Sequence, residues 1–213
     1  MGDDTRAGLT RHTMIETALR LLDEVGLEGL TVRRLAAELG VKSPSLYWHI
    51  RTKQDLLDGV ADAITRSAGM GPPRDGESWQ EWLARRARAY RRAVLTHRDG
   101  ARLVASGKLL GLDTVKELDR ELAAMVERGF TPLLALDTIA AIGRYVLGFV
   151  LQEQNEHLPA TPMDELAGLL DGGVSAPLLV ALRDGGSMGE AAFEHGLRTL
   201  IDGTAAALAR LPR

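Results

Sequence analysis

A cluster of hydrogen-bonding and aromatic side chains lies between residues 43 and 49 of the chain. It contains hydroxyl, phenol, indole and imidazole groups, carried by Ser43, Ser45, Tyr47, Trp48 and His49. Groups of these kinds donate hydrogen bonds to phosphate oxygens and to the edges of bases. Aromatic side chains in a helix more often belong to a core, but Tyr47 and Trp48 cannot both pack inward beside their apolar neighbours. We therefore expect at least one of the two rings to face outward.

Basic residues concentrate in the same part of the chain. Residues 31–53 contain five basic residues and one acidic residue, which gives this segment a charge of +4. From residue 54 onward, 18 basic and 22 acidic residues give −4, and the whole chain carries −3. A charged run is commonly just a solvated face, but a compact basic segment on an acidic chain favours a polyanion-binding surface at one end.

The composition excludes several kinds of chemistry. The chain has no cysteine, which rules out disulfides, thiolate catalysis and cysteine-ligated zinc. Its five histidines are widely spaced, with no HExxH pair and no glycine-rich phosphate loop. An all-helical enzyme that uses His97 and Asp99 is an alternative, but charges at such positions commonly have a structural role at a helix end. We expect no enzymatic activity, no cofactor and no metal site.

No segment of the chain predicts export or a membrane span. The polar N-terminus, residues 1–13, lacks the apolar core of a signal peptide. The longest apolar region, residues 131–151, is interrupted by Asp137 and Arg144. We expect a cytoplasmic protein without a membrane partner.

Helical spacing of apolar residues continues through most of the chain. The N-terminal part predicts a helix over residues 13–25 that ends at two glycines. Thr31 is a suitable cap for a short helix that ends at Gly40. Ser43, followed by Pro44, is a suitable cap for another that runs through His49. A fourth helix is predicted over residues 52–68.

The glycine- and proline-rich segment of residues 69–77 is the clearest break in the chain. We predict an all-α protein with two domains, residues 1–68 and residues 69–213. The second domain is expected to contain helices over residues 78–96, 113–129, 131–151 and 190–208, and a loop over residues 158–175. Asp113 is expected to cap the second of these helices.

Residues 31–53 read as a short helix, a glycine turn and a second short helix. This is the helix-turn-helix arrangement, in which the second helix enters the major groove. The stretch GLEGLTVRRLAAELGVKSPSLYWHIRTKQDLLD, residues 26–58, resembles the DNA-binding domain of the tetracycline-repressor (TetR) family. The likeness continues through residues 76–80, 97–101, 148 and 154–157, and thins beyond His157. It implies a ligand-responsive repressor that binds a palindromic operator in double-stranded DNA as a homodimer.

The resemblance implies roles for eight DNA-binding residues. Arg33 resembles an arginine that reads guanine, a base whose O6 and N7 accept two hydrogen bonds. Pro44 and Tyr47 resemble residues that contact thymine methyl groups and the backbone. Ser43 replaces a base-reading glutamine and cannot make its bidentate contact with adenine, so the operator sequence should differ. The remaining four resemble residues that bind the sugar-phosphate backbone: Ser45, Trp48, His49 and Lys53.

The resemblance also implies a ligand-binding site. Tetracycline-responsive members of the family hold a drug–magnesium chelate with two histidines, an asparagine and a glutamate. The matching positions fall near Gly69 and at Arg86, Val104 and Gln152, and none keeps its chemistry. Mg²⁺ prefers oxygen ligands, and the side chains of Val104 and Arg86 supply none. We therefore expect a small organic effector that is not tetracycline.

Three further residues lie at pocket-like positions of the family pattern. Tyr90 preserves an aromatic wall, Lys108 replaces an arginine, and Arg144 replaces another histidine. We expect Arg144 to be a better candidate for the pocket than Arg86, because Arg86 belongs to a basic run of the kind that is usually solvated. These cations favour an anionic or strongly accepting effector.

Two long C-terminal helices of each subunit form a four-helix bundle in the family that the chain resembles. The apolar residues of 133–151 and of the last helix, Leu197, Leu200, Ile201 and Leu208, suit that role. Core packing within one subunit is the alternative for the same residues. A repressor that responds to a protein partner, with no small-molecule effector, also stays open.

Overall fold

The structure is a computed structural model that describes residues 9–108, 110–155, 177, 180–181 and 189–211. Its regular elements there are all helical, which confirms the predicted all-α class. The principal helices are α1 (Arg11–Gly29), α2 (Val32–Glu38), α3 (Ser43–Leu46), α4 (Lys53–Ser67), α5 (Trp79–Leu95), α6 (Gly100–Ser106), α7 (Leu112–Val126), α8 (Pro132–Gln154) and α11 (Gly189–Leu208). The predicted loop over residues 158–175 lies outside the described residues.

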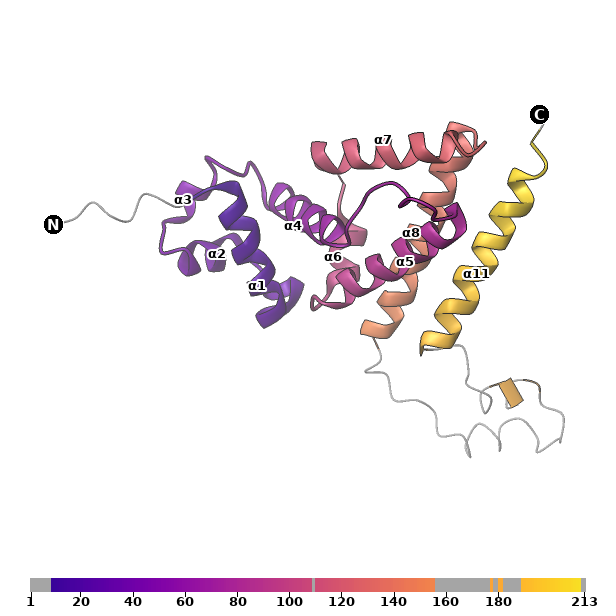
Figure 1. Ribbon diagram of the computed structural model, residues 1–213. Coiled ribbons are helices and arrows are strands. Elements are labelled where there is room, and N and C mark those ends of the chain that lie inside the picture. The colour runs from indigo at the N-terminus through magenta and orange to yellow at the C-terminus, as the bar shows by residue number, and fades with distance from the viewer. Residues whose placement is uncertain (1–8, 109, 156–176, 178–179, 182–188, 212–213) are drawn as a thin grey trace.

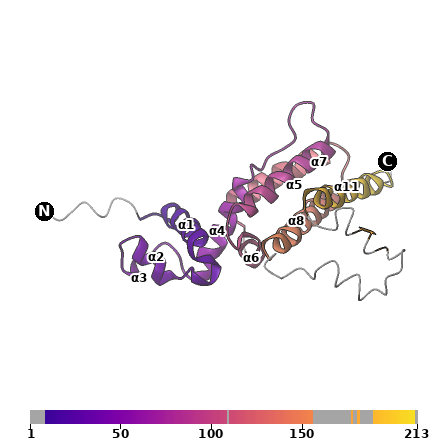
Figure 2. The same ribbon diagram turned by 90° about the horizontal axis from the view of Figure 1, so that it is seen from below.

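The helices are arranged as a small N-terminal group joined to a larger one. Figure 1 shows α1, α2 and α3 at one end of the molecule, with α4 leading from them into the other helices. At the far end α8 and α11 lie side by side, and the view from below in Figure 2 shows the same arrangement. Helix α5 packs against α4, α6, α8 and α11, so it forms the centre of the larger group.

The first two helices form largely as expected. Helix α1 bends at Gly26, whose φ of 71° lies in the left-handed region that glycine adopts without steric cost. The Thr31 hydroxyl accepts a hydrogen bond from the Arg34 N–H and so caps α2. Leu22 of α1 and Leu35 of α2 are fully buried in the shared core.

Helix α3 is shorter than predicted, and its cap differs. It spans Ser43–Leu46, and the next three residues form a turn. Lys42 occupies the N-cap position without a side-chain hydrogen bond, so the expectation that Ser43 caps this helix is wrong. Pro44 lies in the first turn, where its missing N–H leaves no helical hydrogen bond unmade.

Two features of the larger group were not predicted correctly. Helix α6 was not expected as a separate element. The cap of α7 is Gly111, because the helix begins before Asp113, which lies in its first turn. An acidic residue in that position still interacts favourably with the helix dipole.

Helix α4 connects the two groups. Its cap is Thr52, whose hydroxyl accepts a hydrogen bond from the Asp55 N–H. Its buried side chains pack against α1 on one side and against α5 and α6 on the other. The carboxylates of Asp58 and Asp62 accept hydrogen bonds from the backbone N–H groups of Lys108 (3.0 Å) and Gly111 (2.8 Å). These bonds hold the segment between α6 and α7 against α4.

A second connection joins the turn before α6 to the end of α1. The Asp99 carboxylate accepts a hydrogen bond from the Leu27 N–H at 2.9 Å, and His97 lies 3.1 Å from the Asp23 carboxylate. Gly26 is required here, because a Cβ at this residue would lie 2.8 Å from the Asp99 carboxylate. His97 and Asp99 therefore have the structural role that the sequence suggested.

Helix α8 is long and apolar enough to span a membrane when judged by length and composition alone. The two charges that the sequence places in this segment, Asp137 and Arg144, do not take the helix outside that range. A third of its most apolar 18-residue window is buried in the structure. Core helices of soluble proteins pass the same test, because they are also long and apolar.

The arginines of α5 pair with carboxylates from several elements. Arg85 pairs with Glu77, and Arg88 pairs with Glu194 of α11. Arg91 binds Glu153 of α8 and Glu190 of α11. Its guanidinium also lies 4.6 Å from the centre of the Phe193 ring and 5.6 Å from that of the Phe149 ring. The hydrogen bond to Glu153 is the main cause that raises the pKa of Arg91.

Replacing Arg91 should therefore destabilise the larger group. The side chain is only 13% exposed, so Arg91→Ala leaves two carboxylates without their cation and removes the contacts with the rings. We expect a loss of about 3 kcal/mol in the free energy of unfolding. Arg92→Ala, at an exposed neighbour, should stay within about 0.5 kcal/mol of wild type. Urea unfolding at one fixed protein concentration checks both values, and equal midpoints for the two variants would contradict the role of Arg91.

Candidate nucleic-acid interface and ligand pocket

The eight residues predicted to bind DNA all reach the surface of the N-terminal group. Both aromatic side chains face outward, Tyr47 with 52% and Trp48 with 88% exposure, whereas the apolar residues on either side of this turn, Leu46 and Ile50, are buried. The expectation that at least one ring faces outward is confirmed. The other six residues are exposed or half-buried: Arg33, Ser43, Pro44, Ser45, His49 and Lys53.

The charges on this surface are unpaired. Within the described part of the chain, none of the five basic residues between 31 and 53 forms an ion pair. The single acid of this segment, Glu38, pairs with Arg20 of α1 instead. The surface therefore keeps a positive potential, which attracts a polyanion.

Two of these cations sit near helix N-termini. Arg33 is the second residue of α2, and Lys53 is the first residue of α4. The N–H groups of the first turn of α4 lie beside Lys53, and such groups bind phosphate well. The arrangement can thus offer a base-reading guanidinium and a phosphate-binding ammonium on one surface.

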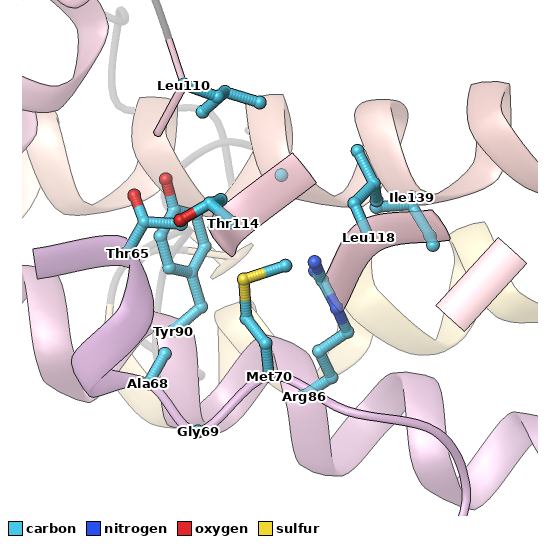
Figure 3. Close-up of a pocket in the computed structure, with 11 residues that line it drawn as sticks. Thr65, Ala68, Gly69, Met70, Arg86, Tyr90, Leu110, Thr114, Leu118 and Ile139 are labelled. Atoms are coloured by element: carbon cyan, nitrogen blue, oxygen red, sulfur yellow. The ribbon is translucent and has the colours of Figure 1, made fainter. Parts of the chain in front are cut away.

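A pocket lies inside the larger group, between the end of α4 and helices α5, α7 and α8 (Figure 3). Its volume is about 160 Å³, and most of its wall is apolar. The residues that line it are Thr65, Ala68, Gly69, Met70, Arg86, Tyr90, Leu110, Thr114, Leu118, Ile139 and Gly143.

The structure brings only some of the predicted ligand-binding residues together. Arg86 and Tyr90 line this pocket, as does Gly69. Val104 and Lys108 line a smaller neighbouring hollow that shares Thr65 and Leu110 with it. Two residues lie elsewhere, on the exposed side of α8: Arg144 and Gln152.

The expectation that Arg144 rather than Arg86 faces the pocket is wrong. Helix α8 turns its buried stripe, with Ile139, Ile142 and Val146, toward the core, and Arg144 lies on the opposite side. Arg86 points inward and is paired, so it does not belong to a solvated face.

The charge of Arg86 is neutralised within the protein. Its Nε donates hydrogen bonds to the two oxygens of the Glu121 carboxylate of α7, at 3.1 and 2.9 Å, and its Nη2 lies 2.9 Å from the same carboxylate. The Arg86 side chain is 15% exposed, and that of Glu121 is fully buried. Glu121 also accepts a hydrogen bond from the Gly71 N–H, which ties the segment after α4 to α7.

Tyr90 contributes a hydroxyl at another part of the wall. Burial is the main cause that raises the pKa of this phenol, so it stays neutral at physiological pH. The neighbouring Thr65 side chain opposes this rise in the pKa.

Sequence reasoning missed most of the pocket wall. Thr65, Met70, Leu118 and Ile139 come from four different elements and share no motif. Thr114 and Leu118 are one helical turn apart on α7, so their common face could be inferred, but what that face lines could not. Glu121 carried no sign that it would be the partner of Arg86.

Each of the two groups of helices matches a known family model. Residues 14–60 match the model for bacterial regulatory proteins of the tetR family, and residues 72–208 match the model for the tetracyclin repressor-like C-terminal domain. The class D tetracycline repressor protein of Escherichia coli is 40% identical over 204 residues, which cover 92% of this chain and 89% of the repressor. The chain belongs to the TetR family.

Solved structures of TetR-family proteins share the fold. A variant TetR from Acinetobacter baumannii AYE in complex with minocycline is 31% identical, with a TM-score of 0.72 over 94% of this chain and 98% of that one. BioQ with its natural double-stranded DNA operator is 28% identical, with a TM-score of 0.65 over 93% of this chain and 99% of that one. This chain is accordingly a ligand-responsive transcriptional repressor with a helix-turn-helix DNA-binding part and a helical ligand-binding part.

The pocket of this TetR-family chain does not fit a magnesium chelate. Its described lining residues include no histidine and no carboxylate, and the single charged group among them is the Arg86 cation. Mg²⁺ binds oxygen ligands in near-octahedral geometry and depends strongly on carboxylates. The lining offers hydroxyl groups but no anionic ligand.

The exposure of Trp48 can be tested by fluorescence. The chain has three tryptophans, of which Trp82 is fully buried and Trp79 packs edge-on against Phe130. Acrylamide should therefore quench mainly Trp48, and Trp48→Phe should remove most of the quenchable emission. Equal quenching in Trp79→Phe and Trp48→Phe would show that the surface is placed wrongly.

Proposed function

We propose that this TetR-family chain represses transcription as a homodimer bound to a palindromic operator, and that a metal-independent organic effector other than tetracycline releases it. The supporting observation is the course of α4. Its first residue, Lys53, lies on the basic surface, and Thr65 near its other end lines the pocket. A helix of 15 residues spans about 22 Å, so one rigid element joins the two sites.

Release follows from differential binding to two states. An effector can shift the equilibrium only if it binds the released state better than the DNA-binding state. The pocket wall includes residues of α4 and of the segment that follows it, so a ligand that fills the pocket acts directly on the position of α4. The bonds from Asp58 and Asp62 couple the segment before α7 to the same movement.

The concave, mostly apolar pocket favours a small molecule over a protein as the effector. A protein partner that acts through a surface has no need of a mostly apolar interior space, whereas ligand sites are typically concave and apolar with a few polar groups. Our proposed domain boundary lies at residues 68 and 69, directly beside this pocket. It stays a prediction, as do the individual roles of the site residues.

Replacing the two cations of the DNA-binding surface, Arg33 and Lys53, should impair DNA binding in different ways. Arg33→Ala should lose roughly 1–3 kcal/mol on the selected operator and relax the preference at one position of each half-site. Lys53→Ala should weaken specific and nonspecific binding alike and should flatten the salt dependence, because it removes a phosphate contact. Operator selection followed by fluorescence anisotropy at several salt concentrations measures both effects. Wild-type affinity in both variants would refute the assigned interface.

The dimer is proposed to form through the exposed sides of α8 and α11. Family members form a bundle from two long helices of each subunit, and Ala141, Arg144 and Gly148 form part of the exposed stripe of α8. Val146 is fully buried within the subunit, so it belongs to the core rather than to this interface. Half-sites should lie about one helical turn apart, because both recognition helices must reach one face of the duplex.

A charge on the α8 stripe tests the dimer. A Cβ at Gly148 would meet no atom of the subunit within 4 Å, so Gly148→Glu leaves the subunit itself unstrained. We expect Gly148→Glu to raise the dimer dissociation constant strongly, because dimerisation would strip water from two added carboxylates, one from each subunit. Gln80→Glu, which adds the same charge at an exposed site on α5, should dimerise like wild type. Sedimentation equilibrium decides, and a wild-type monomer at micromolar concentration would contradict the proposal.

Tetracycline with magnesium should not release this repressor from its operator. The lining lacks anionic metal ligands, and its single charged group among the described residues is the Arg86 cation, which would repel a chelated cation. Operator release is measured by anisotropy with tetracycline, with and without Mg²⁺, beside a panel of neutral ring compounds and organic acids. Magnesium-dependent release at micromolar tetracycline would contradict the metal-independent effector.

A further inference from the structure

The Thr114 hydroxyl is the one buried side-chain polar atom in the described part of the chain that has no hydrogen-bond partner. Thr114 is 1% exposed, and it lines the pocket. Helical threonines usually donate to the carbonyl four residues earlier, as Thr65 does to Ala61 and Thr204 does to Leu200. Buried polar groups without any partner are rare in folded proteins, so each requires an explanation.

The position of Thr114 in its helix explains why this hydroxyl is left over. Helix α7 begins at Leu112, with Gly111 as its N-cap. The residue four positions before Thr114 is Leu110, which precedes the cap and is not part of the helix. The usual helical acceptor is therefore missing. In Figure 3 the hydroxyl lies toward the side of the pocket that carries Thr65 and Tyr90, away from Arg86.

The electrostatics of the pocket disfavour a charged ligand. The single cation of the described wall, Arg86, already makes a bidentate pair with the fully buried Glu121. An anion placed beside Arg86 would compete with Glu121 and bring a second negative charge next to a buried carboxylate. The earlier expectation of an anionic effector also relied on Arg144 and Lys108, neither of which lines this pocket.

We propose that the effector is an uncharged, mainly apolar ring compound whose hydroxyl or carbonyl group hydrogen-bonds to Thr114. This inference rests on the proposed function, because it specifies the ligand of the same pocket. The pocket is large enough for one aromatic ring: its volume of about 160 Å³ is close to that of apolar cavities of about 150 Å³ that bind benzene. Apolar wall residues such as Met70, Leu118 and Ile139 contact the ring, and Thr114 selects for the polar group.

Three toluenes that differ in the para substituent separate the possible ligand classes, and the two neutral ones have the same shape. They are p-cresol, which is neutral and can hydrogen-bond; p-xylene, which is neutral and cannot; and p-toluate, which is an anion. Binding to the full-length protein is measured by calorimetry and by NMR titration. We expect p-cresol to bind on the order of tenfold more tightly than p-xylene, as one hydrogen bond to a buried hydroxyl predicts. We expect p-toluate to bind most weakly.

Thr114→Val tests the residue itself, because valine has the shape of threonine without the hydroxyl. The affinity of this variant for p-cresol should fall to or below that for p-xylene, because the phenol hydroxyl would be buried without a partner, while its affinity for p-xylene stays unchanged. Without a ligand its melting temperature should equal or exceed that of wild type, because an unpaired hydroxyl is removed. Thr96→Val, at an exposed site whose hydroxyl is bonded to the Arg92 carbonyl, is the matched control and should leave p-cresol affinity unchanged.

Each alternative result overturns the inference. Tightest binding by p-toluate would assign the pocket to anions, and a p-cresol affinity that Thr114→Val does not alter would remove Thr114 from recognition. A lower melting temperature of Thr114→Val would show that the hydroxyl has a partner in the protein, and the absence of saturable binding by p-cresol would exclude this ligand class. Operator binding is measured on the same samples without a ligand. If the protein does not bind the operator without a ligand, the proposed function is contradicted. The p-cresol measurements still decide the ligand class.

Discussion

The placement of α4 is the constraint on which the other features of the molecule depend. Its first turn belongs to the exposed basic surface, its middle is packed between α1 and the helices α5 and α6, and its last turn forms part of the pocket wall. Two carboxylates on its side, Asp58 and Asp62, hold the segment before α7 by backbone hydrogen bonds. Because α4 takes part in both sites, a movement of α4 changes the geometry of both.

The charged residues are arranged differently in the two groups of helices. In the larger group the cations of α5 are compensated by carboxylates of neighbouring elements, so Arg86, Arg88 and Arg91 connect helices rather than create a potential. In the described residues of the helix-turn-helix the cations have no such partners, and the net charge of +4 between residues 31 and 53 faces the solvent. This contrast makes one end of an acidic chain attractive to DNA.

Features that depend on local sequence were predictable, and features that depend on distant partners were not. The caps at Thr31 and Thr52 and the break at Gly26 follow from short-range chemistry, and the structure has them. Helix α6 is only seven residues long, too short for apolar periodicity to reveal it. The residues predicted to bind DNA lie within one continuous stretch, which is why a motif could indicate them together. The pocket is assembled from separate elements, so the orientation of Arg86 depended on Glu121, 35 residues away.

The walls of the pocket differ in how firmly they are held, and this difference gives the direction in which a ligand would act. Helices α5 and α8 are fixed to each other and to α11 by the contacts of Arg91 and by the aromatic cluster of Tyr145, Phe149 and Phe193. The last turn of α4 has weaker restraints: the Thr65 and Ser67 hydroxyls donate within their own helix, and the ion pair of Arg66 with Asp113 of α7 is exposed, with 3.8 Å between the charged atoms. A ligand that needs more room than the unliganded pocket offers would therefore displace α4 before it displaces α5 or α8. The displacement is then carried along a single helix to Lys53, where a small rotation moves the basic surface relative to its two-fold related copy on DNA.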